Sequence, residues 1–189
     1  ASQLFGETPE ETCEKARVSR EQGYRAVKFG WGNYGRLTAA HDRDQVAAAR
    51  RGLGDDGILM IDAGTVWVND VEQAQARLPA LADNNVYWLE EPFVGDALSA
   101  YRELADASEG VRIAGGEGAF NAHMARNLID YGKIDFVQID TGRIGGIGPS
   151  KLVAEYAAAS GIEFVNHTFT THLALSASLA AFAGVEPWE

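Results

Sequence analysis

The stretch GILMIDAGTVWVNDVEQAQARLPALADNNVYWLEEP, residues 57–92, decides the fold. It joins two short apolar segments, 57–64 and 86–92, through the amphipathic segment 70–83. The apolar segments have the length and composition of buried strands, and the segment between them has the pattern of a helix. This order predicts an α/β fold in which parallel strands are joined by helical crossovers.

The same alternation runs through the rest of the chain. Further strands are expected at 24–30, 111–118, 135–142 and 162–168. Further helices are expected at 8–22, 36–53, 96–108, 121–131, 148–160 and 172–183. Six strands and seven helices at even spacing favour a (β/α)₈ TIM-type barrel over a doubly wound sheet. Because such a barrel typically needs about 250 residues, we expect residues 1–189 to form an incomplete one, with the first and eighth strands largely missing.

Local signals mark several of the expected helix ends. Thr8 is a good N-cap because Pro9 follows it at the first helical position. Gly23, Gly132 and Gly161 follow helical segments, where glycine commonly adopts the left-handed conformation that ends a helix.

The composition restricts the class of partner and the compartment. A net charge of −11 argues against a nucleic-acid partner. No apolar run is long enough to span a membrane, and a single cysteine, Cys13, fits a reducing compartment. We therefore expect a cytoplasmic protein without a nucleic-acid or membrane partner. A small-molecule carboxylate substrate and a homo-oligomeric state are expected as well.

Charged or titratable residues occupy the ends of the expected strands. They are Lys28, Asp62, Glu90 with Glu91, Glu117, Asp140 and His167. Catalytic groups of a barrel lie at these carboxyl ends. Neighbouring carboxylates in a poorly solvated site would repel one another, and a divalent cation would remove that repulsion. Carboxylates without a cysteine ligand suit Mg²⁺.

Each of these residues also has a plainer explanation when it is taken alone. Asp62 could cap a helix, Glu90 could belong to a solvated turn, and His167 could be a hydrogen-bonded residue at a strand end. Recurrence at the same level of successive strands favours a common site.

The motifs VKFG, IDAG, LEEP, GGEGAF, QIDTGRIGG and NHTF, in this order, resemble the barrel domain of the enolase superfamily. The mandelate racemase/muconate lactonizing enzyme-like branch, which holds the acid-sugar dehydratases, is the best fit. The resemblance covers 1–189 and implies a partial C-terminal barrel domain without its N-terminal capping domain. It also implies that Mg²⁺ is held by Asp62, Glu90 and Glu117.

The resemblance further implies how the reaction proceeds. His167, oriented by Asp140, would abstract the proton next to the carboxylate of the substrate, and Lys28 would neutralise the resulting enediolate. Arg143 would contact the substrate or form a salt bridge to a neighbouring carboxylate. Residues of the loop after Lys28 would line the substrate mouth, namely Trp31, Asn33 and Tyr34, although Trp31 could instead pack on a neighbouring loop.

Three departures from the family pattern matter. Gly30 replaces the second lysine of the usual Lys-x-Lys pair, so one of the two bases of a racemase is missing. Gly64 stands where relatives often have asparagine. The usual eighth-strand glutamate has only Glu186 and Glu189 as local candidates.

The leading hypothesis is therefore a Mg²⁺-dependent lyase that removes water from a sugar acid or related hydroxycarboxylate. One alternative is a racemase or epimerase in which Tyr34 or a water supplies the second base. Another is a barrel that binds metal and acid without turnover. The run GRIGGIGP, 142–149, lacks the Lys-Ser/Thr of a phosphate loop, and we interpret it as a tight turn entering a helix.

Overall fold

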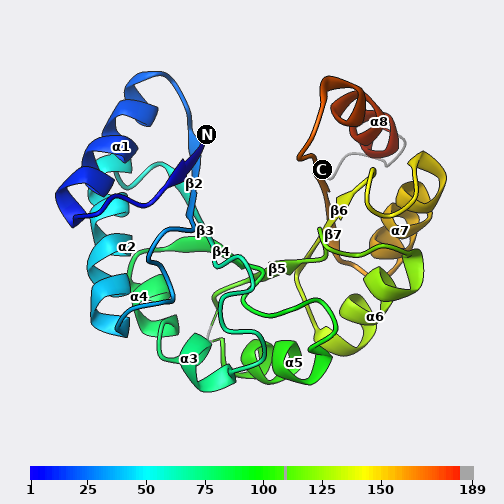
Figure 1. Cartoon of the computed structure of the whole chain (residues 1–189), viewed down its shortest axis with the longest axis horizontal. Coiled ribbons are helices and arrows are strands. Elements are labelled where there is room, and N and C mark those ends of the chain that lie inside the picture. Colours follow the sequence, from blue (N-terminus) through cyan, green and yellow to red (C-terminus); the bar gives the residue numbers. More distant parts are fainter. Residues whose placement is uncertain (109, 184–189) are drawn as a thin grey trace. The chain divides into compact units, whose positions relative to one another are not determined.

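The computed structural model describes residues 1–108 and 110–183 and divides into two compact units. Of these residues, the first unit comprises 1–94, 106–108 and 110–112, and the second comprises 95–105 and 113–183. Each unit alternates strands with helices along the chain, as predicted (Figure 1). Neighbouring strands within each unit pair in parallel, which was also expected.

The first unit holds four strands in the order β1-β2-β3-β4. Their bounds are Ser2–Leu4, Ala26–Gly30, Ile58–Asp62 and Val86–Glu90. Its helices are α1 Pro9–Glu21, α2 Ala39–Leu53, α3 Val71–Gln75 and α4 Leu78–Asp83. Helix α2 packs against α1 and α4, and the three helices lie along one side of the strands (Figure 1).

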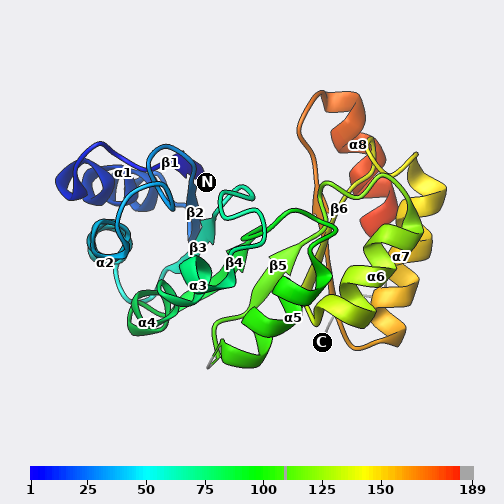
Figure 2. The same ribbon diagram turned by 60° about the horizontal axis from the view of Figure 1, so that its bottom comes forward.

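The second unit holds β5 Ile113–Gly115, β6 Phe136–Asp140 and β7 Glu163–His167 in that order. Its helices are α6 Ala122–Gly132, α7 Ile147–Ala159 and α8 His172–Phe182. Most of α5, Leu98–Ala107, also belongs to this unit. Helix α7 packs between α6 and α8, and these helices cover one side of β6 and β7 (Figure 2).

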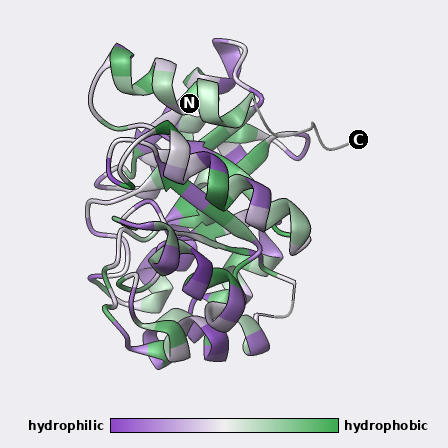
Figure 3. Cartoon of the chain, turned by 90° about the vertical axis from the view of Figure 1, so that its right-hand side faces the viewer, coloured by the Kyte–Doolittle hydropathy of each residue, from purple (hydrophilic) through white to green (hydrophobic). Residues whose placement is uncertain are grey.

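Apolar strands and amphipathic helices build the core of each unit. Figure 3 shows the strands largely in green, the apolar colour, and the helices banded in green and purple. Val27, Phe29, Leu59, Ile61 and Leu89 are fully buried in the strands of the first unit. Burial of such side chains stabilises the fold by about 1.5–3 kcal/mol each.

The structure differs from the sequence-based expectation in its secondary structure at several places. A short strand, Ser2–Leu4, pairs with β2, so the described residues contain seven strands rather than six. The expected helix over 70–83 is broken into α3 and α4, with Pro79 in the first turn of α4, where its missing N–H costs nothing. Lys133 rather than Gly132 takes the left-handed conformation after α6.

Several predicted helix signals are confirmed. The Thr8 side chain accepts a hydrogen bond from the Glu11 N–H, and Pro9 is the first residue of α1. Gly145 and Gly146 have φ values of 105° and 115°, which favour glycine, immediately before α7 begins. The glycine-rich run at 142–149 therefore contains the tight turn that was expected.

Candidate active site

Strand register places three residues in one row at the carboxyl ends of the first unit's strands. Gly30 pairs with Asp62 across β2 and β3, and Asp62 pairs with Glu90 across β3 and β4. Asp62 is 7% exposed and Glu90 is completely buried. Two carboxylates buried side by side need positive charge or hydrogen-bond donors to stay ionised.

Lys28 supplies that positive charge. Two residues before Gly30, it lies on the same face of β2, and its ammonium contacts Glu90 Oε1 and lies 3.3 Å from Asp62 Oδ2. Burial is the largest single influence and lowers the pKa of Lys28, but the two carboxylates outweigh it and raise the pKa above its usual value. Lys28 is therefore protonated and neutralises part of the charge of this acidic pair.

Each carboxylate has a further donor within the first unit. The indole N–H of Trp88 donates to Glu90 Oε2 over 2.9 Å, and the backbone N–H of Gly64 donates to Asp62 Oδ1 over the same distance. Trp88 was missed by sequence reasoning. Its spacing of two residues from Glu90, which places both side chains on one face of the strand, is the signal that could have found it.

Gly30 is required by the close approach of two strands. A Cβ atom at this position would lie 2.6 Å from the backbone oxygen of Asp62 and 2.7 Å from its Cβ. Such contacts are too short for any side chain without a shift of the backbone. Gly30 itself supplies no base, and any side chain at this position would require a shift of the β2–β3 pair.

Two residues of the loop after β2 that were predicted to line the substrate mouth, Trp31 and Tyr34, differ in their exposure. Trp31 is 56% exposed, and its ring lies over Gly64, where an added Cβ would come within 3.3 Å of the indole. Trp31 thus packs on a neighbouring loop and still presents more than half of its surface, so its contact with substrate stays a prediction.

Tyr34 corrects the sequence-based expectation. It is 2% exposed and stacks on Phe5 at a ring separation of 5.1 Å. Burial, followed by the charge of Asp42, raises the pKa of the Tyr34 hydroxyl far above its usual value. Tyr34 is a core residue, because its ring packs against the buried ring of Phe5 near the start of the chain. It is therefore not a base at neutral pH.

The second unit brings Asp140 and His167 together as predicted. The two residues are register partners at the carboxyl ends of β6 and β7. His167 Nδ1 lies 2.9 Å from Asp140 Oδ2, while Asp140 Oδ1 accepts hydrogen bonds from the backbone N–H groups of Gly142 and Arg143. These donors fix the carboxylate, which in turn fixes the imidazole.

Glu117 contacts the other side of the imidazole. Its Oε2 lies 3.0 Å from His167 Nε2, and its Oε1 lies 3.0 Å from Arg143 Nη1. Glu117 follows Gly116, whose φ of 114° and short approach to the backbone of Gln138 both favour glycine. Strand β5 ends earlier than expected, so Glu117 lies two residues beyond the strand rather than at its last position.

The two flanking acids set the charge of His167. Burial is the largest single influence and lowers its pKa, but the hydrogen bonds and charges of Glu117 and Asp140 together raise the pKa above its usual value. A ring that holds a proton between two carboxylates can both accept and return one, which is the property of a general acid–base.

The predicted Mg²⁺ ligands are divided between the units, with Asp62 and Glu90 in the first and Glu117 in the second. Over 1–108 and 110–183 there is no group of three or more acidic, His or Cys side chains arranged to hold a metal ion. The local donors nevertheless fit a hard cation, because Asp62 and Glu90 are carboxylates that already share one cation, the Lys28 ammonium. The metal site stays a prediction, and Glu186 and Glu189 lie outside the described residues.

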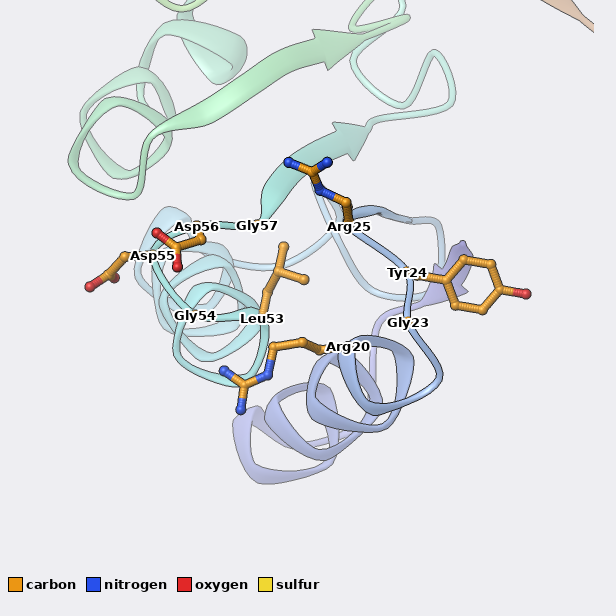
Figure 4. Close-up of a pocket in the computed structure, with 9 residues that line it drawn as sticks. All are labelled: Arg20, Gly23, Tyr24, Arg25, Leu53, Gly54, Asp55, Asp56 and Gly57. Atoms are coloured by element: carbon orange, nitrogen blue, oxygen red, sulfur yellow. The ribbon is translucent and has the colours of Figure 1, made fainter.

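A hollow lies at the opposite, amino-terminal end of β2 and β3. Figure 4 shows Arg20, Tyr24, Arg25, Asp55 and Asp56 among the residues that line it, at the turns that lead into the two strands. Arg20 lies against Gly54, where a Cβ would approach its guanidinium to 2.7 Å. Two arginines and two aspartates line this hollow, so its charges are balanced. Lys28, Asp62 and Glu90 meet at the opposite end of the strands.

In the part of the chain that the structure describes, no helix is long and apolar enough to cross a membrane.

Comparison with known proteins gives matches over 77–97% of this chain. It is 32% identical to the L-talarate/galactarate dehydratase of Salmonella typhimurium, over 97% of this chain and 44% of that protein. It is 34% identical to the 3,6-anhydro-alpha-L-galactonate cycloisomerase of Streptomyces coelicolor, over 77% of this chain and 38% of that protein. A crystal structure from Rhodobacter sphaeroides, described as a predicted mandelate racemase, is 61% identical with a TM-score of 0.92.

The Rhodobacter match covers 97% of this chain and 47% of that one, so the chain spans less than half the length of each of these relatives. A family model described as "Enolase C-terminal domain-like" matches residues 11–188. The resemblance seen in the ordered motifs is therefore confirmed. The chain belongs to the enolase C-terminal domain-like family, among the mandelate racemase-like members of the enolase superfamily.

Proposed function

We propose that the protein is a Mg²⁺-dependent hydro-lyase that removes water from a sugar acid or a related hydroxycarboxylate. The observation that carries the proposal is the Asp140–His167 pair at the ends of two adjacent strands. The relative named as an L-talarate/galactarate dehydratase supports the class of substrate.

His167 acts as the base in this proposal. In the neutral ring Nδ1 carries the proton, because Asp140 Oδ2 is an acceptor. Nε2, once it has given up its proton and its contact with Glu117 Oε2, takes the proton from the carbon next to the carboxylate of the substrate. The electron pair of the broken C–H bond moves into an enediolate. Asp140 stabilises the imidazolium that forms, and such a base contributes about 10²–10⁴-fold to the rate.

The same imidazolium then acts as the acid. It returns its Nε2 proton to the hydroxyl group on the next carbon, the C–O bond breaks, and water leaves. The enol product becomes a 2-keto acid. One residue performing both transfers implies that the proton and the hydroxyl leave from the same face of the substrate.

Positive charge is needed to stabilise the enediolate. Lys28, protonated between two carboxylates, is assigned to the substrate carboxylate or the enediolate. We assign Asp62, Glu90 and Glu117 as the residues that would hold Mg²⁺. When bound, the metal supplies a Lewis acid that favours the charged form of the substrate.

A racemase or epimerase is the second candidate, favoured by the 61% identity to a protein described as a predicted mandelate racemase. Two-base racemisation needs a proton acceptor on each face of the substrate. Gly30 carries no side chain, and Tyr34 lies in the core. These two observations support dehydration by a single base.

A screen of the full-length protein with Mg²⁺ against sugar acids, read out as 2-keto product, tests the proposal. The His167→Asn variant is expected to lose about 10²-fold or more of that activity, while His123→Asn, an exposed position on α6, should retain it. Unchanged activity in His167→Asn would rule out the proposed base. Incorporation of solvent deuterium without loss of water would favour the racemase.

A further inference from the structure

Arg143 connects the two acids that flank His167. Its backbone N–H donates to Asp140 Oδ1 over 3.0 Å. Its guanidinium Nη1 lies 3.0 Å from Glu117 Oε1 and 3.4 Å from the Glu117 backbone oxygen. The backbone of Arg143 thus fixes the Asp140 carboxylate, and its side chain fixes the Glu117 carboxylate.

The two contacts on Glu117 use different oxygens. Arg143 holds Oε1 and His167 Nε2 holds Oε2, so the loss of either contact does not require the loss of the other. The guanidinium also lies 5.6 Å from the ring centre of Phe169, a cation–π distance. The side chain of Glu117 is 15% exposed, which makes its charge costly without these partners.

We propose that Arg143 is a positioning residue that acts through Glu117: it orients this carboxylate for a divalent cation and keeps it beside the base. This rests on the metal assignment made under the proposed function. It replaces a direct contact with substrate as the main role of the Arg143 side chain. Partners of this kind, which orient metal ligands, typically change metal affinity about 10–100-fold when they are removed.

The side chain can be tested separately from the main chain. Every substitution other than proline keeps the N–H that Asp140 accepts, so Arg143→Gln removes the Glu117 anchor and leaves the Asp140–His167 pair oriented. Arg143→Lys restores the charge without the planar guanidinium. Arg126→Gln is the matched control, because Arg126 stacks on Tyr156 at 4.1 Å on the helices of the same unit.

Binding of Mn²⁺ to the full-length protein, measured by EPR of the free ion without substrate, is the deciding experiment. Arg143→Gln should weaken Mn²⁺ binding about 10–100-fold, Arg143→Lys by less, and Arg126→Gln should not change it. The midpoint of urea unfolding should fall only slightly in Arg143→Gln, because the Arg143 side chain is 40% exposed and Glu117 keeps its contact with His167.

Three results would overturn the proposal. A raised KM with unchanged Mn²⁺ affinity in Arg143→Gln would assign the residue to substrate binding. A lowered unfolding midpoint with unchanged Mn²⁺ affinity would make its role structural. A wild-type protein that binds no Mn²⁺ would remove the metal on which the proposal rests. If wild type binds Mn²⁺ and shows the expected series but dehydrates no acid, the proposed function fails and the positioning role stands.

Discussion

Arg77 and Asp42 form an ion pair in which both side chains are almost completely buried, at 3% and 1% exposed. Arg77 Nε donates to Asp42 Oδ2 over 3.0 Å, and its Nη2 donates to the Leu37 carbonyl. Asp42 also accepts the backbone N–H of Gly35. The pair therefore fixes the loop between β2 and α2, which begins with Trp31 directly after the strand that carries Lys28.

Removal of one partner should be strongly destabilising. Arg77→Met leaves the Asp42 carboxylate buried without its cation, and we expect the free energy of unfolding to fall by about 3–5 kcal/mol. Urea unfolding measures this. Arg43→Met, which breaks an exposed pair with Asp44, should cost less than about 1 kcal/mol. Equal effects of the two substitutions would contradict the structure.

The close approach at Gly30 gives a second prediction. Gly30→Ala places a methyl group 2.6 Å from the Asp62 carbonyl oxygen, and we expect a loss of about 1–3 kcal/mol of unfolding free energy from overpacking. Gly148→Ala is the matched control. Gly148 lies in α7, and a Cβ added there would meet open space, so alanine should stabilise the helix by about 0.5–1 kcal/mol. A stabilising Gly30→Ala would show that the strands are farther apart.

The environment of His167 predicts a pH dependence. Its pKa in the folded protein lies above the value of about 6.5 for an unfolded histidine. The charged ring therefore stabilises the fold fully below that pH, and the contribution is lost as the pH rises through the folded-state pKa. NMR titration of the ring nitrogens without added divalent cation should give a raised pKa that Asp140→Asn lowers. A wild-type value at or below about 6.5 would contradict the arrangement.

The hydrogen bond from Trp88 to Glu90 predicts an energetic coupling between the two side chains. Trp88→Phe should be less destabilising when Glu90→Gln is already present, with a coupling of about 0.5–3 kcal/mol in a double-mutant cycle. Trp67→Phe serves as the control, since the Trp67 indole donates to the Gly35 carbonyl instead. Additive effects of Trp88→Phe and Glu90→Gln would show that the two groups do not interact in solution.

Apolar periodicity was enough to predict most of the elements. Six strands and the helices between them were predictable because each strand is a short apolar segment and each helix an amphipathic one. The exceptions depend on distant contacts. Ser2–Leu4 is a strand because it pairs with β2, and its three residues, two of them polar, are too few to show the apolar pattern of a strand. Likewise, the helix expected over 70–83 is interrupted where Arg77 turns inward to meet Asp42, 35 residues earlier.

The candidate site was predictable where position along a strand determined the outcome. Asp140 and His167 are last in their strands, so parallel register brings them together. The prediction for Tyr34 was wrong because its environment is set by Phe5, and nothing in the local sequence shows that contact. The bond from Arg143 to a carboxylate could be raised as an alternative, but only the three-dimensional arrangement identifies that carboxylate as Glu117.

Gly30 has a consequence for anyone who wishes to engineer this protein. Installing a lysine there, to add a base on the opposite face, would first require β2 and β3 to separate at the level of Asp62. A single codon change is therefore a poor route to a two-base enzyme. Directed evolution would have to begin with substitutions that remodel the strand pair, or recruit the new base from another loop.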